Sequence, residues 1–161
     1  MVTIGGNNRE LWIRHACVAG ASLWFKGNPP FSSDKRHMFF VLGTLGTDKI
    51  VLVNATSQVH KRLHNLDATL RMFGVAATDV TVRLPAGSHP FITKDTVIDC
   101  SRPFILTRHD LAAGEDFSLL SNPPSEEFFV PLLHAWAASP FAQPAYLEEI
   151  RGQWARRGIV F

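Results

Sequence analysis

The sequence has few cysteines and no long apolar run. Its two cysteines, Cys17 and Cys100, stand alone, without CxxC or CxxH spacing. This spacing argues against a disulfide framework and a structural zinc site, so a reducing cytoplasm is the expected compartment. No stretch approaches the roughly 18 consecutive apolar residues that a membrane span needs, and the N-terminus lacks the basic-then-apolar order of a signal peptide. The sequence therefore predicts a cytoplasmic protein without a membrane segment.

Charge is also scarce, because only 19% of the 161 residues are charged while 46% are hydrophobic. A chain of this size and composition predicts a single globular domain over residues 1–161 and excludes a disordered or fibrous protein. The net charge of +2 is uneven: residues 1–100 hold 11 Lys and Arg against 7 Asp and Glu, whereas residues 101–161 hold 5 against 7. A basic front part is compatible with a phosphate backbone or an acidic partner.

Apolar runs and turn residues predict a series of strands in the front two-thirds of the chain. A strand is expected over 21–26, ended by the GNPP turn at 27–30. Two continuous apolar runs, 38–43 and 50–57, predict adjacent strands that are buried on both faces. The alternation in VTVRL predicts a half-exposed strand over 80–84.

The rest of the chain has a more helical pattern. Residues 58–72 fit either a helix or a long loop with one helical turn, and the pattern leaves this open. A helical turn is expected near residue 110, and Ser125 is the expected N-cap of a helix. A second amphipathic helix is expected to end at Gly158. A β-rich body therefore precedes a helical C-terminus.

The amino-acid sequence of these segments resembles that of the MazF/PemK-type toxins, which are messenger-RNA endonucleases of toxin–antitoxin pairs. The matching segments are GASLWFKGNPP, RHMFFVLG, VLVNATS and LPAGSHPFITKDTVIDC, in this order. The resemblance implies a mainly β fold, with a small SH3-like antiparallel barrel over 20–111 and a helical C-terminal extension over 112–161. It also implies a homodimer that cleaves single-stranded RNA and is neutralised by a cognate antitoxin.

The resemblance also implies positions for site residues. The family's catalytic arginine falls at His37, with Arg36 directly before it, and the family's catalytic threonine falls at Thr56. Ser57 follows Thr56, and Lys94 matches the later segment, so both are expected to contact the substrate.

Metal-independent RNA cleavage needs a base for the 2′-hydroxyl, an acid for the leaving oxygen and a cation for the charge on phosphorus. Two imidazoles can supply base and acid near neutral pH, and His37 and His89 are the chosen pair. Arg36 would supply the charge and Thr56 a hydroxyl contact to the phosphate. No metal or cofactor is required. The alternative is that both histidines cap strand ends and that Thr56 forms an ordinary strand-end turn.

Further polar residues lie between the two matched halves. His60 and His64 have the spacing of metal ligands on a helix, but no third ligand is evident and the intervening Lys61 and Arg62 repel a cation. Lys61, Arg62 and Arg71 are better candidates for phosphate contacts, with a solvated helix face as the alternative.

Other residues favour structural roles. Asp95 and Asp99 are expected to cap turns. Trp12, Trp24 and Phe31 could stack on unpaired bases, but aromatic side chains more often pack a small barrel.

The same barrel also serves toxins that poison DNA gyrase without chemistry, so the fold does not fix the target. A non-catalytic binding module is therefore the second functional hypothesis. The apolar faces of the C-terminal helices are expected to cover the barrel, with docking of a partner as the alternative.

Overall fold

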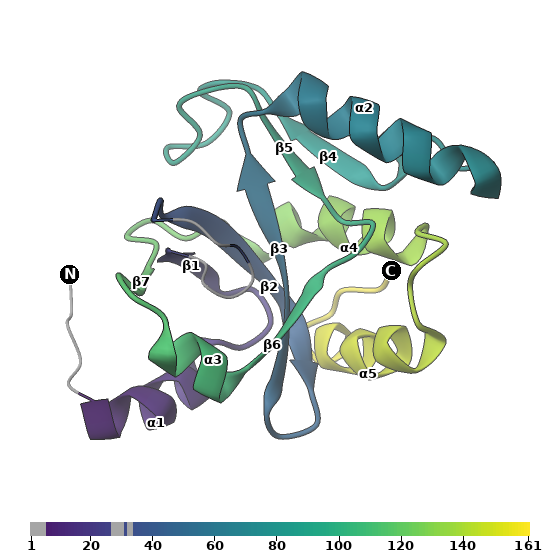
Figure 1. Cartoon of the computed structure of the whole chain (residues 1–161). Helices are drawn as coiled ribbons and strands as arrows, with labels where there is room; N and C mark the ends of the chain where they lie inside the picture. The colour runs from purple at the N-terminus through teal and green to yellow at the C-terminus, as the bar shows by residue number, and fades with distance from the viewer. Residues whose placement is uncertain (1–5, 27–30, 32–33) are drawn as a thin grey trace.

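The computed structural model describes residues 6–26, 31 and 34–161 (Figure 1). Within these residues, the helices α1 to α5 span Gly6–Ala16, Val59–Leu70, Arg108–Ala113, Phe129–Ala137 and Pro144–Ala155. The strands β1 to β7 span Ser22–Phe25, His37–Leu45, Lys49–Thr56, Thr81–Leu84, Thr96–Asp99, Phe104–Thr107 and Ser118–Leu119. Short 3-10 helices η1 to η3 cover Arg71–Phe73, Ala77–Asp79 and Glu126–Phe128.

The strands form one antiparallel sheet in the order β4-β5-β3-β2-β1-β7, with β6 as an additional partner of β3. One edge of β3 pairs with β2 along nearly its whole length. The other edge pairs with β6 in its first half and with β5 at Ala55 and Thr56. The apolar runs at 38–43 and 50–57 are thus neighbouring central strands, which confirms the sequence prediction.

Both faces of the central strands are buried, which explains why the two runs are apolar throughout. Phe40 and Leu42 of β2 pack in the core formed with α4 and α5, called the α4/α5 face below. Phe39 and Val41 alternate with them and pack in the core formed with α1 and α3, called the α1/α3 face. Figure 1 shows these two pairs of helices at different sides of the strands.

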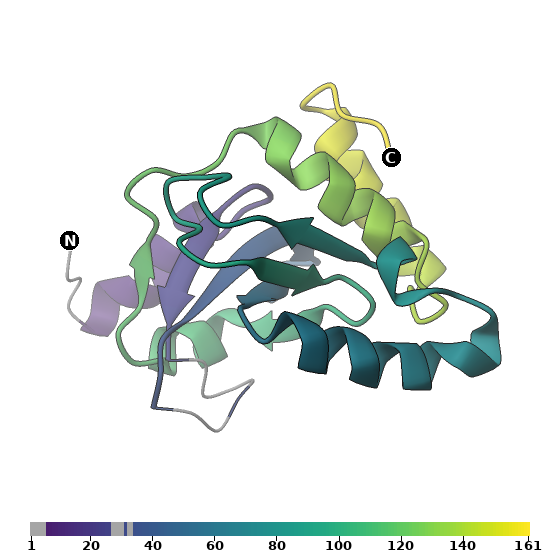
Figure 2. The same cartoon turned by 90° about the horizontal axis from the view of Figure 1, so that it is seen from above.

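The segment 58–72, which the sequence left undecided, is helical in α2 and η1. Leu66 and Leu70 of α2 pack with Ala77 and Val80 in a separate small core. Figure 2 shows α2 along one side of β4 and β5, with α4 along the other. This arrangement leaves the N-terminal part of α2 beside the end of β3.

The C-terminal helices confirm the predicted helical extension, although Ser125 is the N-cap of η3 and its side chain makes no capping hydrogen bond. The helix α1 and the strands β6 and β7 were not predicted. The expected turn at 27–30 lies outside the described residues. The protein thus mixes α and β structure around an antiparallel sheet, so the expectation of a mainly β fold is confirmed only for its β-rich middle. No helix in the described ranges is long and apolar enough to cross a bilayer.

Candidate functional site

A row of residues crosses four strands at one end of the sheet. The register pairs Arg83 of β4 with Val97 of β5, and Val97 with Thr56 of β3. The last pair between β2 and β3 is Met38 with Ala55, so His37 and Thr56 come next in this register. Directly opposed residues in antiparallel strands point to the same face, and neighbouring strands lie about 4.8 Å apart. His37, Thr56, Val97 and Arg83, called the sheet-end row below, therefore share one face.

That face is the α1/α3 face. Thr56 lies an even number of residues from Ile50 and Leu52 along β3, so its side chain points to the same face as theirs. The side chains of Ile50 and Leu52 pack in the α1/α3 core. His37 is two residues from Phe39 along β2, so it points to the same face as Phe39, which packs in the same core. The sheet end is open there, because His37 and Thr56 are half-buried and Arg83 is exposed. The row thus offers an imidazole, a hydroxyl and a guanidinium on one surface.

His37 lies against an aromatic wall. Its ring centroid is 4.7 Å from that of Phe31 and 6.4 Å from that of Phe39. Nε2 is buried and makes no hydrogen bond to any of the described residues. Burial, and secondly the positive charge of Lys35, lower the pKa of His37 from its ordinary value of 6.5. The lowered pKa favours the neutral imidazole, and its buried Nε2 carries no hydrogen bond from the described residues.

Thr56 is oriented by the chain that follows it. Its Oγ1 accepts a hydrogen bond from the backbone N–H of Gln58 at 3.2 Å. Gln58 precedes α2, and its carbonyl oxygen accepts the N–H of Arg62 at 2.9 Å. Since Oγ1 already accepts a backbone N–H, its own proton is free for donation to a ligand oxygen. The start of α2 thus fixes a hydroxyl donor beside His37.

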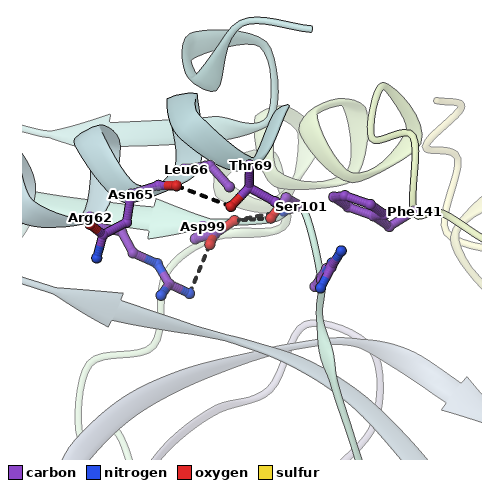
Figure 3. A pocket seen from close by; sticks show the side chains of 8 residues that line it. Arg62, Asn65, Leu66, Thr69, Asp99, Ser101 and Phe141 are labelled. Atoms are coloured by element: carbon purple, nitrogen blue, oxygen red, sulfur yellow. Dashed lines mark hydrogen bonds and ion pairs between the residues drawn. The ribbon is translucent and has the colours of Figure 1, made fainter. Parts of the chain in front are cut away.

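Arg62 forms an ion pair with a buried carboxylate near the row (Figure 3). Its guanidinium lies 2.8 Å from Oδ2 of Asp99, whose side chain is only 6% exposed. Oδ1 of Asp99 accepts hydrogen bonds from the backbone N–H of Ser101 at 2.8 Å and from its hydroxyl at 2.6 Å. The charge of Arg62 is therefore balanced within the protein.

The turn roles predicted for the two aspartates are confirmed. Asp99 accepts the N–H of Ser101, and Asp95 accepts the N–H of Ala86 at 2.9 Å.

The expected convergence of Arg36 and His89 with His37 is wrong. The ring of His89 stacks on Phe91 at 5.3 Å and contacts Phe128 edge-on at 5.0 Å, and these phenylalanines belong to the α4/α5 face. Arg36 lies over the ring of Trp24 and donates a hydrogen bond to Ser118. Trp24 also packs against the α4/α5 core. His37 and His89 therefore lie on opposite faces of the sheet and cannot act as base and acid on one phosphodiester.

The other predicted contact residues are exposed around the row. Ser57 directly follows Thr56, Lys61 lies on α2, and Lys94 lies in the loop between β4 and β5. His60 and His64 are both exposed on α2. The described residues contain no group of three or more side chains that could hold a metal ion.

Arg83 is a site residue that the sequence reasoning missed. It is exposed and makes no ion pair with a described residue. The alternation in VTVRL carried the signal, because Val82 and Leu84 belong to the α4/α5 face and Arg83 therefore points to the other one. Only the register across β5 places it level with Thr56.

No known protein family matches the chain, and no curated protein matches it significantly. Proposals about its function therefore rest on the geometry of the row and on the resemblance of its sequence segments.

Proposed function

We propose that this protein is a divergent MazF/PemK-type toxin that cleaves single-stranded RNA without a metal ion. The observation that carries the proposal is that His37 and Thr56 are the next residues after Met38 and Ala55, the last pair of the β2–β3 register. These are the two positions at which the resemblance puts catalytic residues, and the β2–β3 register makes them neighbours on one face. A base and a phosphate-binding hydroxyl must be within reach of one phosphodiester, and the position of both residues on one face supports the proposal.

The three polar residues of the row each have a chemical role in the proposed reaction. Neutral His37 takes the proton from a ribose 2′-hydroxyl, and the 2′-oxygen attacks the adjacent phosphorus. The bond from phosphorus to the 5′-oxygen breaks, which leaves a 2′,3′-cyclic phosphate and a 5′-hydroxyl that receives its proton from water. Thr56 donates a hydrogen bond to a non-bridging oxygen, and Arg83 stabilises the charge that develops on the phosphoryl group. Lys61 and Lys94 hold neighbouring phosphates by charge.

The sheet supports the SH3-like part of the proposal. β1, β2 and β3 are consecutive antiparallel strands, and one edge of β3 is divided between β6 and β5. A strand that exchanges partners along one edge is suited to a curled sheet, as in a small barrel. In this proposal the protein acts in the cytoplasm as a homodimer and is neutralised by a cognate antitoxin.

The proposal predicts metal-independent cleavage of single-stranded RNA by the purified protein. Cleavage in the presence of a chelator should give a 2′,3′-cyclic phosphate and a 5′-hydroxyl, because the nucleophile is internal to the substrate. An oligonucleotide of the same sequence with a single 2′-deoxy sugar at the cleaved position should remain intact. Mass spectrometry of the products checks both results. Stable binding of another protein without RNA cleavage would instead support a non-catalytic binding module.

Replacement of Arg83 by glutamine is expected to weaken RNA binding through the loss of one phosphate contact. The logarithm of the association constant should then fall less steeply with the logarithm of salt concentration, by about 0.7 in slope for a single strand. Fluorescence anisotropy with a labelled oligonucleotide measures this slope. Arg83→Gln is compared with Arg83 in the His37→Ala protein, which should not cleave the oligonucleotide. Arg156→Gln is the matched control, because Arg156 is exposed at the end of α5. Equal slopes for the two variants would remove Arg83 from the site.

A further inference from the structure

A pocket lies beside the sheet-end row, between α2 and the segment that joins β5 to β6 (Figure 3). Asp99 lines it and is two residues from Val97 along β5, which corresponds to a rise of about 7 Å. The pocket has a volume of about 170 Å³. It is therefore a small compartment next to the place where the scissile phosphate would lie.

One wall of the pocket is a flat cation on an aromatic ring. The guanidinium carbon of Arg102 lies 3.7 Å from the centroid of the Phe141 ring, so the two groups are in van der Waals contact. Arg102 makes no ion pair within the described part of the chain. An arginine fixed on a ring offers a planar, positively charged surface, and unpaired bases stack on such surfaces.

The opposite side of the pocket carries hydrogen-bonding groups that are left for a ligand. An ionised carboxylate has about four acceptor positions, and Asp99 uses three of them for Ser101 and Arg62. The carboxamide of Asn65, on α2, makes no hydrogen bond to another described residue. A base edge that donates an amino group fits this combination of one remaining acceptor and one free amide.

We propose that this pocket binds one unpaired nucleobase of the RNA strand whose phosphodiester lies at the sheet-end row. The inference rests on the proposed function and adds a position of sequence preference to it. The base stacks on Arg102 and donates its exocyclic amino group to Asp99. Adenine, cytosine and guanine carry such a group, whereas the only donor on the pairing edge of uracil is its N3–H, so the pocket favours the three amino bases over uracil at this one position.

The test compares conservative variants of the stacking wall. Arg102→Lys keeps the charge but removes the planar group, and Phe141→Leu removes the ring that supports it. Each variant should raise KM for a single-stranded RNA oligonucleotide by about tenfold, as expected for the loss of one stacked base. Each should also flatten the bias against uracil in a set of oligonucleotides that differ at one position. Arg156→Lys is the control for the arginine change, and circular dichroism establishes that all variants are folded.

A second measurement separates the pocket from the chemistry. In the His37→Ala background, Arg102→Lys should weaken RNA binding by a similar factor, which fluorescence anisotropy measures without cleavage. If the wild-type protein binds RNA but does not cleave it, and Arg102→Lys weakens this binding, the pocket is supported and the proposed enzyme is overturned. If wild-type protein cleaves RNA and both variants keep its KM and base preference, the pocket is overturned and the enzyme stands. Absence of any RNA binding overturns both.

Discussion

The replacement His37→Ala is expected to lower kcat for RNA cleavage by about 10²–10⁴-fold, the usual contribution of a general base. KM should change little, because the imidazole acts on the proton that moves in the transition state and does not carry the binding charge. Single-turnover rates with a short single-stranded oligonucleotide measure this effect. The loss is chemical, since the half-buried ring has no hydrogen-bonded partner among the described residues that alanine would leave unpaired.

His89→Ala provides the matched control. The ring of His89 packs against Phe91 and Phe128 on the α4/α5 face, so its removal should leave kcat within about threefold of wild type. If the His89 variant instead loses as much activity as the His37 variant, the assignment of the chemistry to the α1/α3 face is wrong.

The pH dependence of cleavage gives a further readout of the same prediction. Burial and the charge of Lys35 lower the pKa of His37 below 6.5, so the imidazole stays neutral to a lower pH than a free histidine. Activity should therefore be fully present above pH 6.5 and fall as the pH decreases through this lowered pKa. The residual activity of His37→Ala should lack this acid limb. If the loss of activity on acidification had its midpoint well above pH 6.5, a group other than His37 would be the base.

The central strands could be predicted from the sequence because their environment is simple. Strands covered on both faces need an apolar side chain at nearly every position, and the runs at 38–43 and 50–57 show this directly. The helix α1 has no such pattern, since among its side chains from residue 8 to 16 only that of Ile13 is buried. Two-residue β7 and four-residue β6 depend on pairing with distant strands, which local sequence does not record.

The sequence predicted which residues belong to the candidate site but not how all of them are arranged in space. His37 and Thr56 follow from the resemblance, and their place on one face follows from the register of β2 and β3. Arg36 was expected to join His37 because it is adjacent in sequence, yet adjacent residues at a strand point to opposite faces. His89 failed for a related reason, because the loop that carries it turns toward the α4/α5 core. Partners in a sheet are therefore found by strand parity and register.

The helix α5 completes the edge of β2 that β1 leaves uncovered. β1 pairs with β2 only from His37 to Phe40. Beyond that point the indole Nε1 of Trp154 donates to the carbonyl oxygen of Leu42 at 2.7 Å. The carboxamide of Gln153 accepts the N–H of Thr44 at 2.9 Å and donates to its carbonyl oxygen at 2.6 Å. Gly43 permits this close approach, because a Cβ there would lie 2.8 Å from a side-chain carbon of Ile150.

Trp154→Ala is therefore expected to lower the free energy of unfolding by about 3–5 kcal/mol, because it leaves a large cavity in the α4/α5 core. The indole is fully buried, and its ring centroid is 5.4 Å from that of Phe129. Trp154→Phe keeps most of the volume and leaves the Leu42 carbonyl without its donor, so about 1–3 kcal/mol should be lost. Urea unfolding measures both values, with Arg156→Ala at the exposed C-terminal end of the same helix expected within about 0.5 kcal/mol of wild type. Equal stabilities of the alanine and phenylalanine variants would show that packing at this position contributes nothing, and wild-type stability of both would refute the role of this indole as a cover of the sheet edge.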